Sequence, residues 1–463
     1  MTGIKQYIGT KSYYKRTFAI MLPILLQNAI TNFVSLLDNI MVGQLGTEQM
    51  SGVAIANQLL FVFNLFIFGG LSGAGIFTTQ FCGKGDNEGV RSSVRMKAYI
   101  AAIGVVAFVL VFWTMGPDLI RAFLHEGTEA LDLESTYENG ISYLHMMMIE
   151  TLPFAVTQVF ASTLRECGET VMPMKASLVA VFVNLVGNYI LIFGKFGAPA
   201  LGVVGAAIAT IIARFVESAI LIIYSYKHTK RFPFFEKLFA SFRIKKELAI
   251  DMIKKGTPLV LNEILWAAGM AMLNQCYSVR GLEVVSATNI SSTVFNLFLC
   301  VTTSLGSTIT IIIGHHLGAG KLEEAVKDYK KIMLLGVVLC AGVGIVLIVL
   351  APLLAGIYNT TDTVKNIATQ FLRVCGAFLP VSAYTNACYF TLRSGGKTVI
   401  TFIFDSAFTW VCCVSMALVL TRCTDLPILT IYIIVSSLDI LKGVIGFFMV
   451  KSRRWLVNLV ENQ

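Results

Sequence analysis

Charged side chains are scarce in this chain of 463 residues. Only 14% of the residues are Asp, Glu, Lys or Arg, whereas 56% are hydrophobic, and the mean hydropathy is +0.74. Soluble domains carry about 25% charged residues. The chain therefore has too few charges to cover a water-exposed surface, which excludes a soluble globular protein and predicts an integral membrane protein.

Patterns of catalysis and of metal binding are also missing. The chain contains no C-x-x-C, no H-E-x-x-H and no G-x-S-x-G, and its ten cysteines show no metal-ligand spacing. We therefore expect neither a metal site nor an intramembrane enzyme. The net charge of +9 comes from basic residues in loops rather than on one continuous face, so we expect no nucleic-acid partner.

Long hydrophobic segments, in contrast, are abundant. A helix needs roughly 20 apolar residues to cross a bilayer, and segments of that length recur about twelve times. We expect an all-α integral membrane protein with twelve transmembrane helices. They are predicted near 17–42, 51–80, 98–116, 138–164, 172–194, 201–226, 252–279, 285–314, 331–356, 367–392, 399–421 and 426–450.

The basic residues predict the orientation of these helices. Lys and Arg gather in the connections after the second, sixth and eighth spans and in the C-terminal tail, whereas 118–138 contains only Arg121. Cytoplasmic loops carry an excess of Lys and Arg. We therefore expect a multi-pass protein of the cell (plasma) membrane whose N- and C-termini are both cytoplasmic.

The two halves of the chain repeat each other. Four short motifs recur in the same order at nearly constant separation: Gly83-x-Gly85 with Gly318-x-Gly320, VFNLF at 62–66 and 294–298, Leu152-Pro153 with Leu379-Pro380, and TLRECGET at 163–170 with TLRSGGKT at 391–398. Each half holds six spans, an even number, so both halves enter the membrane in the same direction. The pattern predicts two pseudo-symmetric six-helix lobes, an N-lobe at 1–226 and a C-lobe at 251–463. A cytoplasmic linker at 227–250 joins them, and we expect a monomer.

The first predicted span carries an acid and a proline. Thr31, Ser35 and Asp38 are spaced by four and three residues, so they form one polar stripe on a helix. A carboxylate inside such a span costs several kcal/mol unless a partner offsets it. Pro23 removes a backbone donor and favours a bend. We interpret the span as a bent helix whose acid binds a proton or a cation; the alternative is an acid near the outer interface.

These residues resemble the multidrug and toxic compound extrusion (MATE) family. The resemblance rests on Leu22-Pro23, DNIMVGQLG at 38–46, LGVVGAAIAT at 201–210 and the paired LR-x-x-G-x-T segments. It implies a V-shaped bundle of two six-helix lobes. It also implies a secondary antiporter, with no cofactor beyond its coupling ion, that exports cationic or amphiphilic organic compounds in exchange for protons or sodium ions. The expected partners are these small molecules and membrane lipid.

The resemblance also implies site residues. Asp38, Asn184, Asn188 and Thr210 match the family's N-lobe site for a cation or proton, although Asn188 stands where an aspartate is common. The alternative for the two asparagines is hydrogen bonding between helices. From the acid and the proline on one span, we expect Pro23 to be the hinge of the first helix.

In the C-lobe, Glu263 matches a glutamate that would bind substrate or a proton; the alternative is neutralisation by Lys254 or Lys255. Ser382 stands where some members have an acid, so a sodium site in the C-lobe is not expected. Glu150 is a possible buried acid, judged from its depth in the fourth span alone.

The acids and amides of the spans favour a multidrug efflux antiporter for cationic cargo. The alternative is an exporter or flippase of a lipid-linked precursor on a related two-lobe fold. Such an anionic substrate would require several Arg or Lys residues around it, whereas these spans carry acids instead.

Overall fold

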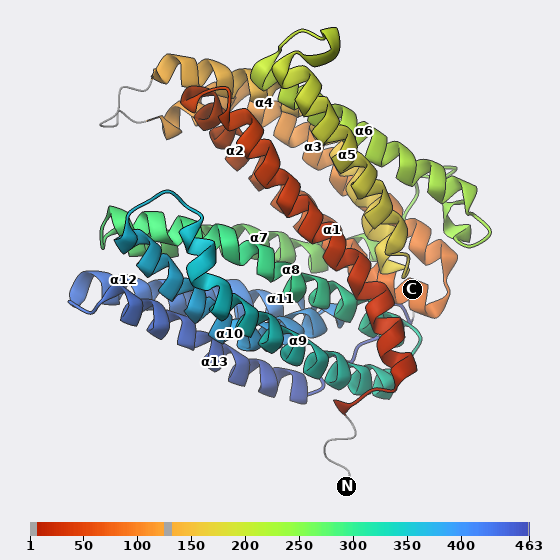
Figure 1. The fold of residues 1–463 in the computed structure, drawn as a ribbon. Coiled ribbons are helices and arrows are strands. Elements are labelled where there is room, and N and C mark those ends of the chain that lie inside the picture. Colours follow the sequence, from red (N-terminus) through yellow and green to blue (C-terminus); the bar gives the residue numbers. More distant parts are fainter. Residues whose placement is uncertain (1–6, 125–131, 462) are drawn as a thin grey trace. The chain divides into compact units, whose positions relative to one another are not determined.

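The structure is a computed structural model that describes residues 7–124, 132–461 and 463, without the side chain of Leu36. Within these residues every regular element is helical, which confirms the all-α class (Figure 1). The longer helices are α1 Lys11–Gly43, α2 Thr47–Lys84, α3 Asn87–Phe123, α4 Leu133–Glu166, α5 Val171–Phe193, α6 Gly202–Lys227, α7 Lys246–Ser278, α8 Leu282–Gly318, α9 Leu322–Gly356, α10 Asp362–Ser394 and α13 Ile428–Lys451.

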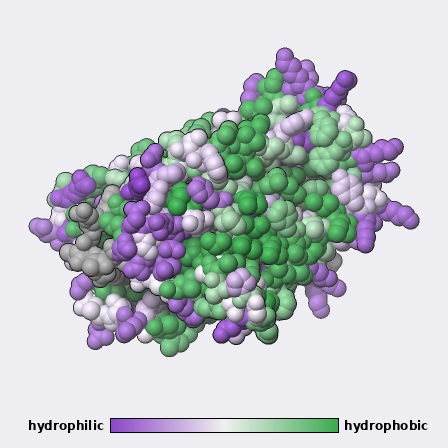
Figure 2. Space-filling view, turned by 90° about the horizontal axis from the view of Figure 1, so that it is seen from above, coloured by the Kyte–Doolittle hydropathy of each residue, from purple (hydrophilic) through white to green (hydrophobic). Residues whose placement is uncertain are grey.

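The expected membrane spans are present as helices. In the described part of the chain, eleven helices are long and apolar enough to cross a membrane. The twelfth expected span, 367–392, lies within α10, which is 33 residues long but less apolar than the others. Figure 2 shows a broad hydrophobic surface with hydrophilic side chains at both of its ends, as a surface in contact with lipid requires.

One span is not a regular α-helix. The segment expected at 399–421 consists of α11 Thr398–Phe402, two π-helical segments at Ile403–Ala407 and Thr409–Val414, and α12 Ser415–Cys423. π-helical turns are rare and are frequent at functional sites. Asp405, the acid of this span, lies in the first π-helical segment.

The chain divides into two compact units. Unit 1 consists of Met1–Leu25, Thr79–Asp86 and Lys254–Gln463, and unit 2 consists of Leu26–Thr78 and Asn87–Ile253. Two helices therefore belong to both units: α1 passes from unit 1 to unit 2 after Leu25, and α2 passes back after Thr78. The assignment of 1–226 and 251–463 to separate lobes stays a prediction.

Unit 2 is built around α4 and α6. The α6 helix packs along both α5 and α4, and α4 also packs against α3. Asp132 caps α4 by accepting hydrogen bonds from the backbone N–H groups of Glu134 and Ser135, both at 3.1 Å. The α5 helix ends at Gly194, whose φ of 65° is the left-handed conformation typical of a helix C-terminus.

Unit 1 is built around α10, which packs against α8, α9 and α13. The C-terminal end of α2 also belongs to this unit and packs closely against α8. A Cβ on Gly83 would overlap the backbone of His315, and a Cβ on Gly318 would overlap the backbone of Gln80. Gln80 lies three residues before Gly83 on α2, and His315 lies three residues before Gly318 on α8. Each glycine therefore packs against the residue three positions before the other glycine, so the contact is reciprocal. A two-fold relation between the repeats produces such reciprocity.

The segment after α13 is fastened to the same end of α2. Gln80 is fully buried, and its Nε2 donates to the backbone oxygens of Ser394 at 3.0 Å and Val457 at 3.3 Å. Its Oε1 accepts from the backbone N–H of Leu459 at 2.7 Å. One amide side chain thus joins α2, α10 and the C-terminal segment.

The α2–α8 crossing predicts a difference between two glycines. Gly318→Ala is expected to lower the free energy of unfolding by about 1–3 kcal/mol, because the added methyl group has no space. Gly342, in the middle of α9, has no atom within 4 Å of an added Cβ. Gly342→Ala should therefore be neutral or stabilising by up to about 1 kcal/mol, because alanine is the better helix former. Melting temperatures of the two variants in detergent compare them directly, and equal values would contradict the reciprocal contact.

Candidate functional site

The acid of the first span lies against two asparagines of α5. Asn188 Nδ2 donates to Asp38 Oδ1 at 2.7 Å, and Asn184 lies one turn before Asn188 on the same helix. The amide group of Asn184 contacts Thr210 Oγ1 of α6 at 3.1 Å. Three helices of unit 2 therefore bring together the four residues predicted for the N-lobe site.

The Asn184 amide can face Asp38 in two ways. With its nitrogen toward Asp38, it donates to the two carboxylate oxygens at 3.0 and 3.2 Å and accepts from Thr210. This orientation suits an ionised carboxylate. With its oxygen toward Asp38, Asn184 accepts from Asn188 Nδ2 at 3.3 Å, but its oxygen then repels an ionised carboxylate unless a proton or a cation lies between them. The charge of Asp38 thus influences the orientation of Asn184.

A second feature of this cluster points to a cation. Asn188 is only 1% exposed, and its Oδ1 accepts no hydrogen bond from the residues that the structure describes. Buried acceptors are rarely left without a partner. Hard cations take carboxylate, amide and hydroxyl oxygens as ligands. The cluster contains these three kinds of oxygen and one formal negative charge, so it can hold a proton on Asp38 or a monovalent cation.

A buried ion-pair cluster lies one turn along α6 from Thr210. Arg214 Nε lies 3.0 Å from Glu150 Oε1, and its Nη1 lies 2.8 Å from Glu217 Oε2. The two glutamates are only 6% and 3% exposed. Glu150, which the sequence marks as a possible buried acid, is therefore paired. Sequence reasoning missed Arg214 and Glu217, although two charges three residues apart in an apolar span are a visible signal.

In unit 1, Glu263 has a different partner from the two lysines suggested by the sequence. Arg393 Nη1 of α10 lies 3.9 Å from Glu263 Oε1, and both side chains are mostly buried. The distance is long for a salt bridge, so the pair is a loose one. Glu263 thus keeps acceptor capacity for a proton or a positively charged group.

Unit 1 contains a second charged cluster that sequence reasoning missed. Lys442 Nζ of α13 lies 2.7 Å from Asp405 Oδ1, and Asn262 Nδ2 donates to Asp405 Oδ2 at 3.1 Å. Asp439, also of α13, accepts from Ser382 Oγ at 3.4 Å. A carboxylate of the last helix therefore lies against the position where Ser382 replaces an expected acid.

Comparison with known proteins identifies the family. A family model described as MatE matches residues 23–190 and 258–419, which together make up most of the chain. The chain belongs to the MatE family. The two matched segments fall in the two halves of the internal repeat, and they contain Asp38, Asn184, Asn188, Glu263 and Asp405.

Several relatives of this MatE chain have descriptive names. A protein of Thermotoga maritima called a probable multidrug resistance protein NorM is 24% identical over 95% of this chain and 93% of its own length. A Bacillus subtilis protein of the same name is 25% identical over 80% of each. Among solved structures, the outward-facing conformation of a multidrug resistance MATE family transporter superposes with a TM-score of 0.85, at 19% identity, over 98% of this chain and 99% of that one.

Membership in the MatE family confirms the class of the protein. The family consists of membrane transporters, so the chain is a multi-pass membrane transporter and not an enzyme. The likeness to the solved structures confirms the expected helical two-lobe fold.

The Arg214 cluster predicts a graded effect on stability. Arg214→Gln leaves two buried carboxylates without their common cation, so we expect a loss of about 3–5 kcal/mol in the free energy of unfolding. Glu150→Gln should cost less, because Arg214 keeps its ion pair with Glu217. Thermal unfolding in detergent measures both variants. A milder effect for Arg214→Gln than for Glu150→Gln would show that the guanidinium does not hold this cluster together.

Proposed function

We propose that this MatE transporter is an antiporter of the plasma membrane that exports cationic or amphiphilic organic compounds from the cell in exchange for protons or sodium ions. The observation that carries the proposal is the cluster of Asp38, Asn184, Asn188 and Thr210, which has the oxygens and the single charge that a monovalent cation requires. The names of the relatives, which are called multidrug resistance proteins, support the cargo.

The charge of the ion-pair clusters around Arg214 and Lys442 supports a positively charged cargo. In unit 2, Asp38, Glu150 and Glu217 lie near one base, Arg214. In unit 1, Glu263, Asp405 and Asp439 lie near two bases, Arg393 and Lys442. The described clusters therefore contain more acids than bases. An anionic lipid-linked precursor, the alternative cargo, would require the opposite balance, so the charge favours organic cations.

The coupling step is an exchange of one positive charge at Asp38. When the site is empty, Asp38 is ionised and the nitrogens of Asn184 and Asn188 face it. A proton or sodium ion entering the site reverses the preferred orientation of Asn184, because its oxygen then faces a positive group. The contacts between α1 and α5 change accordingly. A ligand can shift a conformational equilibrium only if it interacts differently with the two states. This change in the contacts of one helix provides such a difference.

Pro23 is the proposed hinge for this change. It lies inside α1, two residues before the point at which the helix leaves unit 1 and enters unit 2. Proline removes one intrahelical hydrogen bond, so bending costs least close to it. A bend at this position would move Asp38, in unit 2, relative to the first part of α1, in unit 1. The distribution of Lys and Arg supports a cytoplasmic position for both termini.

Transport in proteoliposomes tests the proposal. Vesicles containing the purified protein and an ethidium-like cation receive either a proton gradient or a sodium gradient. We expect one of the two gradients to drive drug movement, and we expect Asp38→Asn to abolish the gradient-driven part, because the amide cannot bind a proton or balance a sodium ion. Pro23→Ala should slow transport while ion binding is retained.

Two controls complete this test. Asp425→Asn changes an exposed acid between α12 and α13 and should transport at the wild-type rate. Asp38→Glu keeps the charge and should retain part of the activity. Gradient-driven transport at full rate in Asp38→Asn, with Asp425→Asn unchanged, would contradict the proposed role of Asp38.

A further inference from the structure

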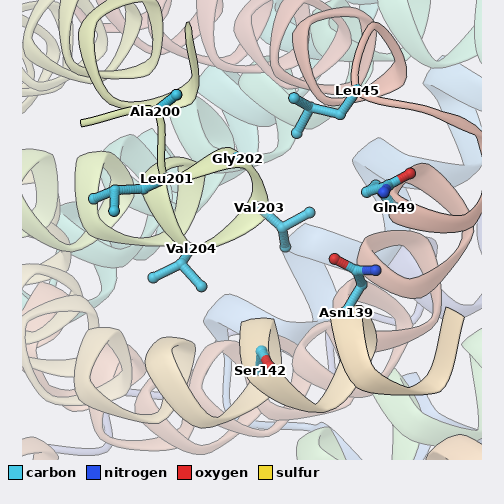
Figure 3. Close-up of a pocket in the computed structure, with 9 residues that line it drawn as sticks. All are labelled: Leu45, Gln49, Asn139, Ser142, Ala200, Leu201, Gly202, Val203 and Val204. Carbon is cyan, nitrogen blue, oxygen red and sulfur yellow. The ribbon is translucent and has the colours of Figure 1, made fainter. Parts of the chain in front are cut away.

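A pocket of about 330 Å³ lies in unit 2 at the end of α1 that is remote from the N-terminus. Its lining comes from the α1–α2 turn, the first turn of α2, α4, and the segment that enters α6. The lining residues are Leu45, Gln49, Asn139, Ser142, Ala200, Leu201, Gly202, Val203 and Val204. Figure 3 shows Gln49 and Asn139 on one side of the pocket and Leu201 and Val204 on the opposite side.

The pocket has the size and the chemistry of a water-filled space. A water molecule in the liquid takes up about 30 Å³, so a pocket of this volume has room for about ten. Gln49, Asn139 and Ser142 provide amide and hydroxyl groups, and none of the lining residues is charged. A hydrated cation can therefore enter without being trapped by a carboxylate.

The pocket lies roughly two helical turns from the Asp38 cluster, just past the end of α1 and along α6. Leu45 follows Asp38 by seven residues, and Val203 precedes Thr210 by seven residues. Seven helical residues correspond to roughly 10 Å. The α1 and α6 helices run in opposite directions. Leu45, which follows Asp38, and Val203, which precedes Thr210, therefore lie on the same side of the cluster. With the proposed orientation of the chain, this is the extracellular side.

An apolar layer one turn thick separates the pocket from the cluster. Val42 follows Asp38 by four residues, Ile192 follows Asn188 by four, and Ala206 precedes Thr210 by four. All three are buried, at 4%, 1% and 5% exposure, and they belong to one hydrophobic cluster that also includes Val203. The α1, α5 and α6 helices thus contribute the oxygen-bearing residues of the cluster, two of them from α5, and each contributes one apolar residue to the layer above it.

We propose that this pocket is the extracellular vestibule through which the coupling cation reaches Asp38, and that Val42, Ile192 and Ala206 form the gate that closes it. The proposal rests on the proposed antiport function and adds the route of the ion to it. Gln49, Asn139 and Ser142 are positioning residues that keep the cation hydrated before the gate opens. Hydrophobic layers of this kind block ions, because an ion that enters one loses its hydration water and gains no polar ligands in exchange.

Charge placed in the vestibule tests the proposal. Ser142 is exposed, so Ser142→Cys can be labelled in right-side-out vesicles with membrane-impermeant methanethiosulfonate reagents of similar size and opposite charge. The measured quantity is the external concentration of the coupling ion that gives half-maximal drug efflux. The cationic label should raise this concentration, and the anionic label should lower it, each by roughly twofold to tenfold for a charge about 10 Å from Asp38. High salt should reduce both shifts.

Matched controls make the result specific. Leu282→Cys, an 85% exposed position at the start of α8 in unit 1, should show no shift with either label, and neither should the labelled wild type with its native cysteines. Gln49→Glu and Gln49→Lys form a second pair of opposite charge for use if labelled Ser142→Cys is inactive, and the same opposite shifts are expected. Val42→Thr, which hydrates the apolar layer, should raise the leak of the coupling ion in the absence of drug.

The outcomes separate the vestibule from the proposed function. Shifts in the same direction for both labels, or no shift in either charge pair, would overturn the vestibule, because a steric or structural effect does not depend on the sign of the charge. A wild-type protein whose efflux depends on neither a proton nor a sodium gradient would overturn the antiport function instead, and this appears before any label is added.

Discussion

The need to neutralise carboxylates inside lipid-embedded helices governs this structure. An uncompensated charge at such a depth is costly, so each acid must meet a base, bind a proton or bind a cation. Glu150 and Glu217 meet Arg214, Asp405 meets Lys442, and Glu263 lies near Arg393. Asp38 differs, because the contacts that the structure describes for it are hydrogen bonds with amides. Arg214 attracts Asp38 electrostatically but already pairs with two glutamates, so in the proposed mechanism the remaining positive charge comes from outside the protein.

The two-fold repeat explains how such a site can influence a large structure. Reciprocal glycine contacts bring α2 and α8 together so closely that no side chain fits between them. The α1 and α2 helices are each shared between the two compact units. In the proposed mechanism, a change in the contacts of α1 at Asp38 acts on a helix that enters the other unit at Leu25, two residues from Pro23. Because packed interfaces respond by switching rather than by gradual deformation, a single ion would then have a large effect.

Much of the fold and part of the candidate site could be predicted from the sequence, because helical periodicity depends only on residues close together in the chain. The spans followed from the length of apolar segments, and spacings of three and four residues were enough to place Asn184 and Asn188 on one face of α5. The position of Asp38 beside them rested on the family resemblance, since 150 residues separate Asp38 from Asn188. Glu150 was recognised as an intramembrane acid, but its partner was not, because Arg214 lies 64 residues away on another helix.

Other features were beyond sequence reasoning for physical reasons. The π-helical segments around Asp405 have the same apolar composition as an α-helix, so hydropathy does not reveal them. The pairing of Asp405 with Lys442 and the contact of Asp439 with Ser382 depend on how distant helices pack. Charges within apolar spans are nonetheless visible in the sequence, and each of them could have been treated as one half of an unknown pair.

The central claim is that Asp38 exchanges an external positive charge when the cargo binds. Its most direct test is the release of the coupling ion on addition of drug to the purified protein in weakly buffered detergent solution, recorded as a pH change or as release of radioactive sodium. The wild type should release one of these ions in proportion to the drug bound, and Asp38→Asn should bind drug without releasing it. Equal release by the wild type and by Asp38→Asn would contradict the account.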